Sequence, residues 1–89
     1  MAWTIEVDDV ALKQLKKLGR TESKRIYDFL RNRIATLDDP RKQGAALQGS
    51  KLGDFWRYRV GDYRIICDIQ DHKLVVLVLQ IGHRRDIYR

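Results

Sequence analysis

The sequence predicts an α+β fold of the order β-α-α-β-β-β, in which an α-helical hairpin covers one face of a mainly antiparallel four-stranded sheet. Three observations lead to this prediction. Two stretches of helical periodicity occupy the first half, two alternating apolar stretches meet at the tight turn Gly61-Asp62, and a valine-rich run follows them. Eighty-nine residues suffice for one modest hydrophobic core, so we expect a single domain over residues 1–89.

The first half of the chain is expected to form one strand and two helices. Residues 3–7 alternate between apolar and polar, as in a half-buried strand. A first helix is expected to stop at Gly19, and a second to begin with Thr21 as its N-cap and end before Pro40. The apolar faces of the two helices are formed by Ala11, Leu15 and Leu18, and by Ile26, Leu30, Ile34 and Leu37.

The stretch 56–67 is expected to form a β-hairpin whose two sides differ sharply. Gly61-Asp62 has the composition of a two-residue type II′ turn, and this turn sets the register of the strands. The apolar side then pairs Val60 with Tyr63, Tyr58 with Ile65, and Trp56 with Cys67, while the reverse side pairs Arg59 with Arg64 and Arg57 with Ile66. Like charges directly opposite each other destabilise a sheet. This arrangement therefore indicates a surface that holds an anion.

The remaining segments complete the sheet. Residues 41–54 read as a polar connection containing three glycines, and residues 70–73 as a second turn. The continuous apolar run 74–81 is typical of a central strand, which we expect Gly82 to terminate.

Composition limits the compartment and the partners. Eighteen Lys and Arg against twelve Asp and Glu give a net charge of +6, which favours a polyanion or an acidic protein as partner. Cys67 is the one cysteine and is expected to be a buried apolar residue. A single cysteine allows no disulfide within the chain, which suits a reducing cytosol. The N-terminus is too short and too acidic for a signal peptide, and no apolar run approaches the ~20 residues of a membrane span. We therefore expect a cytoplasmic protein that binds no membrane.

A small set of side chains is suited to phosphate chemistry. Guanidinium groups bind phosphate through paired donors and stay charged at physiological pH, although a single surface arginine is usually only a solvated charge. An aromatic ring can stack on an unpaired base or simply close the edge of the core, and histidine ordinarily titrates near neutrality. The candidate residues are Arg57, Arg59, Arg64 and Arg84, with Tyr88 and His83.

Metal and nucleotide cofactors are not expected. Two histidines and one cysteine without metal-ligand spacing argue against a zinc site. Because no glycine-rich phosphate loop follows a strand, we expect no nucleoside triphosphate cofactor either.

The succession LQGSKLGDFWRYRVGDYRIICDI, followed by VVLVLQIGHRRDIY, resembles the RelE/ParE superfamily of bacterial toxins, most closely its RelE branch. This resemblance implies the RelE-like microbial RNase fold and a ribosome-dependent endoribonuclease that cuts mRNA in the A site of the 70S ribosome. It also implies a cognate antitoxin as partner, with the free toxin a monomer and the complex a hetero-oligomer. Carried over to this chain, the active residues are Arg57, Arg59, Arg64, Arg84 and Tyr88.

The mechanism that the resemblance implies uses no metal. The ribose 2′-oxygen attacks the adjacent phosphorus, which leaves a 2′,3′-cyclic phosphate and a free 5′-hydroxyl. This chain departs from the best-known members in carrying Arg57 and Arg59 where they carry lysines, and arginine cannot act as a base. His83 is the alternative proton acceptor.

Two other functions are compatible with the sequence. A ParE-like toxin shares the fold but inhibits DNA gyrase and lacks the active residues. A non-catalytic module that binds RNA, or only an antitoxin, is the second alternative.

Overall fold

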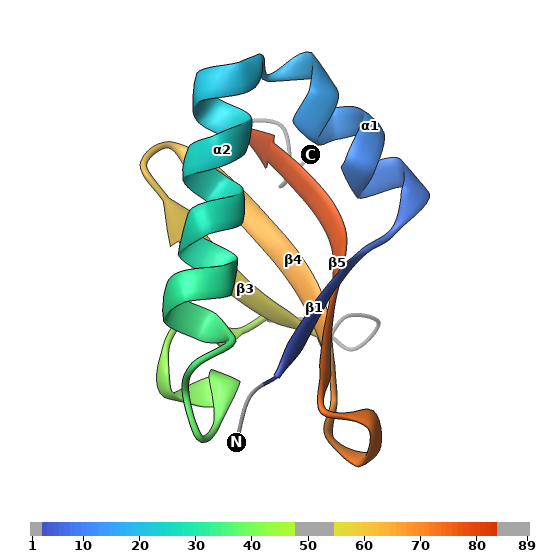
Figure 1. The fold of residues 1–89 in the computed structure, drawn as a ribbon, viewed down its shortest axis with the longest axis vertical. Coiled ribbons are helices and arrows are strands. Elements are labelled where there is room, and N and C mark those ends of the chain that lie inside the picture. Colours follow the sequence, from blue (N-terminus) through green and yellow to red (C-terminus); the bar gives the residue numbers. More distant parts are fainter. Residues whose placement is uncertain (1–2, 48–54, 84–89) are drawn as a thin grey trace.

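The computed structural model describes residues 3–47 and 55–83, and in this part of the chain two helices cover one face of a single sheet (Figure 1). The strands are β1 (Thr4–Val7), β2 (Ala45–Ala46), β3 (Trp56–Val60), β4 (Tyr63–Gln70) and β5 (Val75–His83). The helices are α1 (Asp9–Lys17) and α2 (Arg20–Phe29), which continues into a π-helical turn at Leu30–Ile34; two 3-10 turns span Pro40–Lys42 and Asp71–Lys73. The predicted α+β class and the helical hairpin on one face are confirmed.

The sheet has the order β1-β5-β4-β3-β2, one strand more than predicted. The additional strand is the two-residue β2, which pairs antiparallel with β3 at one edge. Strand β1 pairs in parallel with β5, and the other neighbouring strands are antiparallel. The apolar run at the end of the chain is therefore an interior strand, between β1 and β4, as its composition predicted. None of the helices that the structure describes is long and apolar enough to cross a membrane.

The two helices are joined by Gly19. Its φ of 88° lies in the region that favours glycine, and this conformation reverses the chain between α1 and α2. The backbone N–H of Ser23 donates to the carbonyl of Gly19 at 3.0 Å. Helix α2 therefore begins at Arg20 with Gly19 as its N-cap, and the prediction of Thr21 as N-cap was wrong because the glycine itself occupies that position.

The hairpin has the predicted register. Arg59 pairs with Arg64 and Tyr58 with Ile65, and the other three predicted pairs of β3 and β4 are also present. Gly61 has a φ of 58°, whereas Asp62 has no positive φ, and this combination is that of a type II′ turn. The turn residues therefore set which side chains share a face.

A β-bulge in β5 changes the face of the sheet on which the following side chains lie. Ile66 of β4 pairs with Gln80 and Cys67 with Val78, which leaves Leu79 as the extra residue. This insertion turns Gln80 outward and buries Ile81, whose backbone N–H donates to Oε1 of Gln14 at 2.6 Å. The bulge could not be predicted from the sequence, because the residues before and after it are apolar.

The strand also runs further than predicted. Gly82 was expected to end β5, but it pairs with Arg64, and β5 continues to His83. The prediction was wrong because the neighbouring strand β4 supplies a backbone partner, which outweighs the low strand propensity of glycine.

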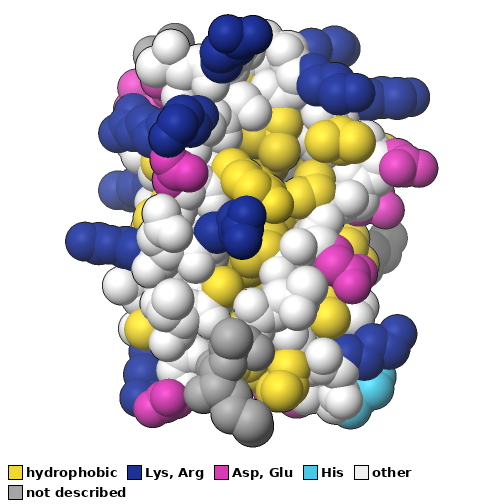
Figure 2. Space-filling model, in the orientation of Figure 1, with side chains coloured by type: hydrophobic (Ala, Val, Ile, Leu, Met, Phe, Trp, Pro, Cys, Tyr) yellow, Lys and Arg dark blue, Asp and Glu magenta, His cyan; other side chains and the backbone are white. Residues whose placement is uncertain are grey.

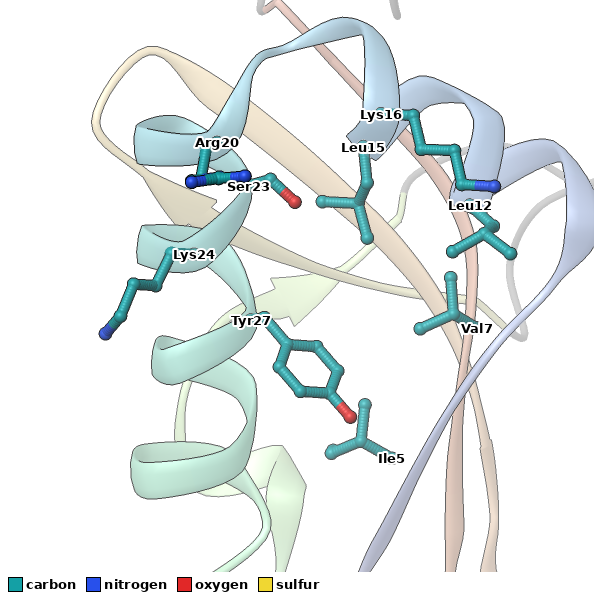
Figure 3. Close-up of a pocket in the computed structure, with 9 residues that line it drawn as sticks. All are labelled: Ile5, Val7, Leu12, Leu15, Lys16, Arg20, Ser23, Lys24 and Tyr27. Carbon is teal, nitrogen blue, oxygen red and sulfur yellow. The ribbon is translucent and has the colours of Figure 1, made fainter.

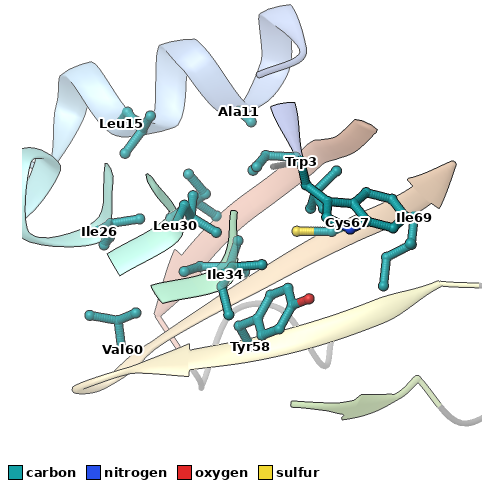
Figure 4. Packing of buried hydrophobic residues seen from close by; sticks show 14 residues of the cluster. Trp3, Ala11, Leu15, Ile26, Leu30, Ile34, Tyr58, Val60, Cys67 and Ile69 are labelled. Carbon is teal, nitrogen blue, oxygen red and sulfur yellow. The ribbon is translucent and has the colours of Figure 1, made fainter. Parts of the chain in front are cut away.

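The core lies between the helices and the inner face of the sheet (Figure 4). Tyr58 and Cys67 are buried in it as predicted, and the ring of Phe29 contacts that of Tyr58 edge to face at a centroid distance of 6.1 Å. Burial raises the pKa of the Tyr58 hydroxyl and of the Cys67 thiol well above their ordinary values. Both groups are therefore neutral at physiological pH.

Candidate nucleic-acid interface

Three of the candidate arginines lie together on the outer face of the sheet, the side away from the helices. Arg57 and Arg59 belong to β3 and Arg64 to β4, and all three line one shallow hollow of about 180 Å³. Arg59 is exposed, whereas Arg57 and Arg64 are half-buried. The structure thus brings these side chains together, as the register of the hairpin required.

The wall of this hollow comes from a segment that the sequence did not single out. Gly44, which precedes β2, and Ala45, its first residue, line it beside the arginines. Gly44 has a φ of 76°, and a Cβ added there would lie 2.2 Å from the backbone oxygen of Arg57. Only glycine allows β2 to approach β3 this closely. The three glycines of the connection 41–54 were a signal for this approach, but they did not show which glycine makes it.

Aromatic side chains fasten the segment that leads into β2. The Tyr58 hydroxyl donates to the carbonyl of Pro40 at 2.7 Å, and the Trp56 indole N–H donates to that of Gln43 at 2.6 Å. The indole N–H of Trp3 donates to the carbonyl of Asp38 at 3.2 Å. Tyr58 and Trp56, on the inner face of β3, therefore position the segment that forms the wall of the hollow. The arginines line that hollow on the outer face of the sheet.

An ion pair attaches the same segment to the β4–β5 turn. Nη1 and Nη2 of Arg41 contact the two carboxylate oxygens of Asp71, each at 2.8 Å. Hydrogen bonding to Arg41 holds the pKa of the Asp71 carboxyl below its ordinary value and raises that of the guanidinium. Because the side chains of Arg41 and Asp71 are 37% and 65% exposed to solvent, this pair fixes geometry more than it adds stability.

The structure places His83 away from the three arginines. His83 pairs with Tyr63 across β4 and β5, and their rings meet edge to face at a centroid distance of 6.1 Å. Tyr63 packs against the core, so the register directs His83 toward the helix side of the sheet, whereas Arg64 and Gly82 share the outer face. The other two candidates, Arg84 and Tyr88, lie outside the described residues.

The hollow has the chemistry of a phosphate site. Three arginines, Arg57, Arg59 and Arg64, line it. Guanidinium groups offer paired donors to phosphate oxygens and stabilise negative charge that develops on them. The described residues contain no group of three or more His, Cys, Asp or Glu side chains arranged to hold a metal ion.

Comparison with known families agrees with this geometry. The family model of the ParE toxin of type II toxin-antitoxin systems, parDE, matches residues 5–88. This chain belongs to that family. The resemblance to the RelE/ParE superfamily that the sequence showed is thereby confirmed, and the protein is a type II toxin.

Individual relatives of this toxin are RelE proteins. It is 31% identical to the mRNA interferase toxin RelE of Escherichia coli over 84 residues, which are 94% of this chain and 85% of that protein. Its fold is similar to that of the toxin–antitoxin complex RelBE2 from Mycobacterium tuberculosis, with a TM-score of 0.84, 24% identity and coverage of 97% and 95% of the two chains. The archaeal RelE–RelB complex from Pyrococcus horikoshii has a TM-score of 0.73 at 26% identity, with coverage of 97% and 99%.

Proposed function

We propose that this toxin is a ribosome-dependent endoribonuclease that cleaves mRNA in the ribosomal A site and thereby stops translation in the cytoplasm. The observation that carries the proposal is the hollow on the outer face of the sheet, where Arg57, Arg59 and Arg64 converge. A surface selected only for folding has little reason to oppose two arginines across a ladder. The similarity to an mRNA interferase of Escherichia coli supports RNA as the substrate.

The proposed reaction is an internal transfer that requires no cofactor. The ribose 2′-oxygen attacks the adjacent phosphorus, its proton passes to a base, and the bond to the 5′-oxygen breaks. The 5′-oxygen takes up a proton, so the products are a 2′,3′-cyclic phosphate and a 5′-hydroxyl. Arg57 and Arg64 stabilise the negative charge of the phosphorane, and Arg59 binds the RNA backbone. From the family resemblance, Arg84 is assigned to the leaving oxygen and Tyr88 to a stacked base.

The proton acceptor is the part of this proposal that needs its own test. Arginine does not accept protons at physiological pH, which leaves His83 as the proposed base. In the structure the His83 ring contacts Tyr63 on the helix side of the sheet. Catalysis by His83 therefore requires its ring to move past the end of β5 to the outer face, where the arginines lie. If His83 is the base, His83→Gln abolishes cleavage and retains RNA binding. Retained cleavage would assign the proton to another group.

We further propose that a cognate antitoxin binds this toxin and forms a hetero-oligomer with it, whereas the free toxin is a monomer. Structures with a similar fold and at least 25% identity include a RelE–RelB complex, which supports this partner. The net charge of +6 suits an acidic antitoxin as well as RNA.

Inhibition of DNA gyrase is the second candidate function. It is favoured by the family match, which is to the ParE toxin. The hollow that Arg57, Arg59 and Arg64 line argues for the nuclease instead, because a toxin that binds a protein target has no need of a phosphate site.

Two assays on the purified toxin separate these functions. Primer extension on an mRNA that is being translated by purified 70S ribosomes should show cuts within codons, and the same mRNA without ribosomes should stay intact. In parallel, DNA supercoiling by gyrase should be unaffected. Intact mRNA together with inhibited gyrase would replace the proposed function by the second candidate, and intact mRNA with active gyrase would favour a non-catalytic module.

A further inference from the structure

The last part of β5 has a neighbouring strand on one side only. Strand β1 pairs with β5 as far as Val78, where the backbone N–H of Asp8 donates to the Val78 carbonyl at 2.9 Å. The chain then enters α1, whereas β4 stays paired with β5 as far as His83. Figure 1 shows β5 continuing past the end of β1 toward the helices. Within the part of the chain that the structure describes, residues 79–83 therefore have β4 as their strand neighbour and no strand opposite it.

A side chain of α1 takes the place of the missing strand. Oε1 of Gln14 accepts a hydrogen bond of 2.6 Å from the backbone N–H of Ile81, a residue that is 1% exposed. Gln14 stands three residues after Ala11 and four before Leu18, on the side of the helix that packs on the core. Because a buried backbone N–H without a partner is strongly destabilising, the Gln14 oxygen satisfies a group that the end of β1 leaves open.

The other side chains of α1 have different surroundings. In Figure 3 the side chain of Leu15 points inward between the two helices, and that of Leu12 lies close to Val7 of β1. The lysines of α1 are exposed, and Figure 2 shows Lys and Arg side chains at the upper end of this face of the molecule. Apolar packing is not directional, whereas a hydrogen bond fixes one backbone group. Gln14 therefore defines where the end of β5 lies relative to α1.

The segment that Gln14 holds lies next to the arginine hollow. Gly82 follows Ile81 and pairs with Arg64, which lines the hollow. The bulge at Leu79 determines that Ile81 faces the core and Gly82 the outer face, and the bond to Gln14 fixes this arrangement. The described lining of the hollow does not include Gln14, so an effect of this residue on the hollow has to pass through β5.

We propose that Gln14 is a positioning residue of the endoribonuclease, which holds the backbone of Ile81 and thereby places the end of β5 for the reaction. The inference rests on the proposed function, which assigns a proton to His83 and the leaving oxygen to Arg84. Both residues follow Ile81 within three positions of the sequence. A displacement of about 1 Å in such groups can slow a reaction roughly 10²-fold. The arginines of β3 do not depend on this bond, so RNA binding is expected to persist without it.

The test changes Gln14 with and without its acceptor. Gln14→Met keeps the length of the side chain and removes the carbonyl oxygen, whereas Gln14→Glu keeps an oxygen that can accept the bond. Gln14→Asn, whose amide is one methylene shorter, replaces Gln14→Met if that variant does not fold. Asn32→Met removes an exposed amide of the helical layer and is the matched control. Ile26→Val, at a buried residue of α2, controls for a loss of stability alone.

Two quantities are measured for each purified variant. Cleavage of mRNA on 70S ribosomes by an excess of toxin gives the rate at saturation and the toxin concentration at half that rate. Hydrogen exchange of the Ile81 amide, followed by NMR, reports on the bond independently of activity. For Gln14→Met we expect a rate at saturation that is about 10–100-fold lower, an almost unchanged half-saturating concentration, and faster exchange at Ile81. Gln14→Glu should restore the rate and the protection, and both controls should cleave like the wild type.

The results that would overturn the inference are distinguishable. If Gln14→Met cleaves at the wild-type rate although Ile81 exchanges faster, the bond is structural and does not position the site. Unchanged exchange at Ile81 would show that the bond does not hold the end of β5. An equal loss of rate in Ile26→Val would attribute the effect to stability. If the folded wild type leaves mRNA on ribosomes intact, the proposed function itself is wrong, and the positioning role is withdrawn with it.

Discussion

Arg59 of β3 and Arg64 of β4 lie directly opposite each other across the hairpin and line the same hollow. Opposed side chains of an antiparallel pair have Cβ atoms about 5 Å apart, so the two positive charges repel each other in the folded state. A type II′ turn at Gly61 enforces this pairing, because it leaves no freedom of register. The hairpin therefore carries a cost in stability, which the RNA backbone would relieve if it binds there as we propose.

Arg59→Gln is expected to stabilise the fold and weaken the function. Removing one of the two opposed charges should raise the free energy of unfolding by roughly 0.2–1 kcal/mol. RNA binding should weaken, and its dependence on salt should become less steep by about one phosphate contact. Urea denaturation and RNA-binding isotherms at several salt concentrations measure the two effects. Arg33→Gln, an exposed arginine of the helical layer, is the control and should change neither.

The Tyr58 hydroxyl is expected to contribute measurably to stability. Tyr58→Phe leaves the carbonyl of Pro40 without its 2.7 Å hydrogen bond in a buried site, which should cost about 1–3 kcal/mol. Tyr58→Ala should cost about 3–5 kcal/mol because it also leaves a cavity in the core. Tyr63→Phe in the same hairpin removes a half-buried tyrosine hydroxyl and should be nearly neutral in urea denaturation. Equal effects of Tyr58→Phe and Tyr63→Phe would refute the role of this bond.

Gly44 offers a test of the wall of the arginine hollow. Gly44→Ala and Gly19→Ala both place alanine at a positive φ, which costs roughly 1–2 kcal/mol. At Gly44 the added Cβ also meets the backbone oxygen of Arg57, whereas at Gly19 nothing lies within 4 Å. We therefore expect Gly44→Ala to be the more destabilising in urea, and to lower RNA affinity as β2 moves away from β3. Gly19→Ala should keep the affinity.

Stability is expected to fall at alkaline pH. Burial raises the pKa of Cys67 and Tyr58 in the folded state, so the unfolded chain loses these protons first. The stability that these groups contribute is complete below the unfolded thiol value of about 8.5, and it is lost as pH rises from there toward the folded-state value. Cys67→Ala should delay the onset to about pH 10, where the unfolded tyrosine ionises. Urea unfolding midpoints of the wild type and of Cys67→Ala, measured between pH 7 and pH 10.5, would show the delay. If the two midpoints depend on pH in the same way, ionisation of the Cys67 thiol does not cause the loss of stability.

The arginine surface was predictable because it depends on local rules. A glycine at the first position of a two-residue turn sets the register, and strand alternation then separates Tyr58 from Arg57 and Arg59. No tertiary information is needed for that step. The chain order and the helical hairpin followed in the same way from periodicity.

The features that the sequence did not reveal all depend on contacts between distant segments. The bulge at Leu79 places Ile81 in the core in place of Gln80, and a hydrogen bond from Ile81 to Gln14 of α1 satisfies the altered backbone. The two-residue strand β2 exists because Gly44 tolerates close approach to Arg57. The position of His83 beside Tyr63 follows from the bulge, so no reading of residues 80–83 alone could place it.

The most direct test of the account is the chemistry of the RNA ends left on translated mRNA by the wild-type toxin and by the double variant Arg57→Ala/Arg64→Ala. We expect the wild type to leave 2′,3′-cyclic phosphates and 5′-hydroxyls. Each lost guanidinium should slow cleavage roughly 10²–10³-fold, while the circular dichroism spectrum stays unchanged. Ends that carry a 5′-phosphate, or a folded double variant that cleaves at the wild-type rate, would contradict the assignment of catalysis to the arginine hollow.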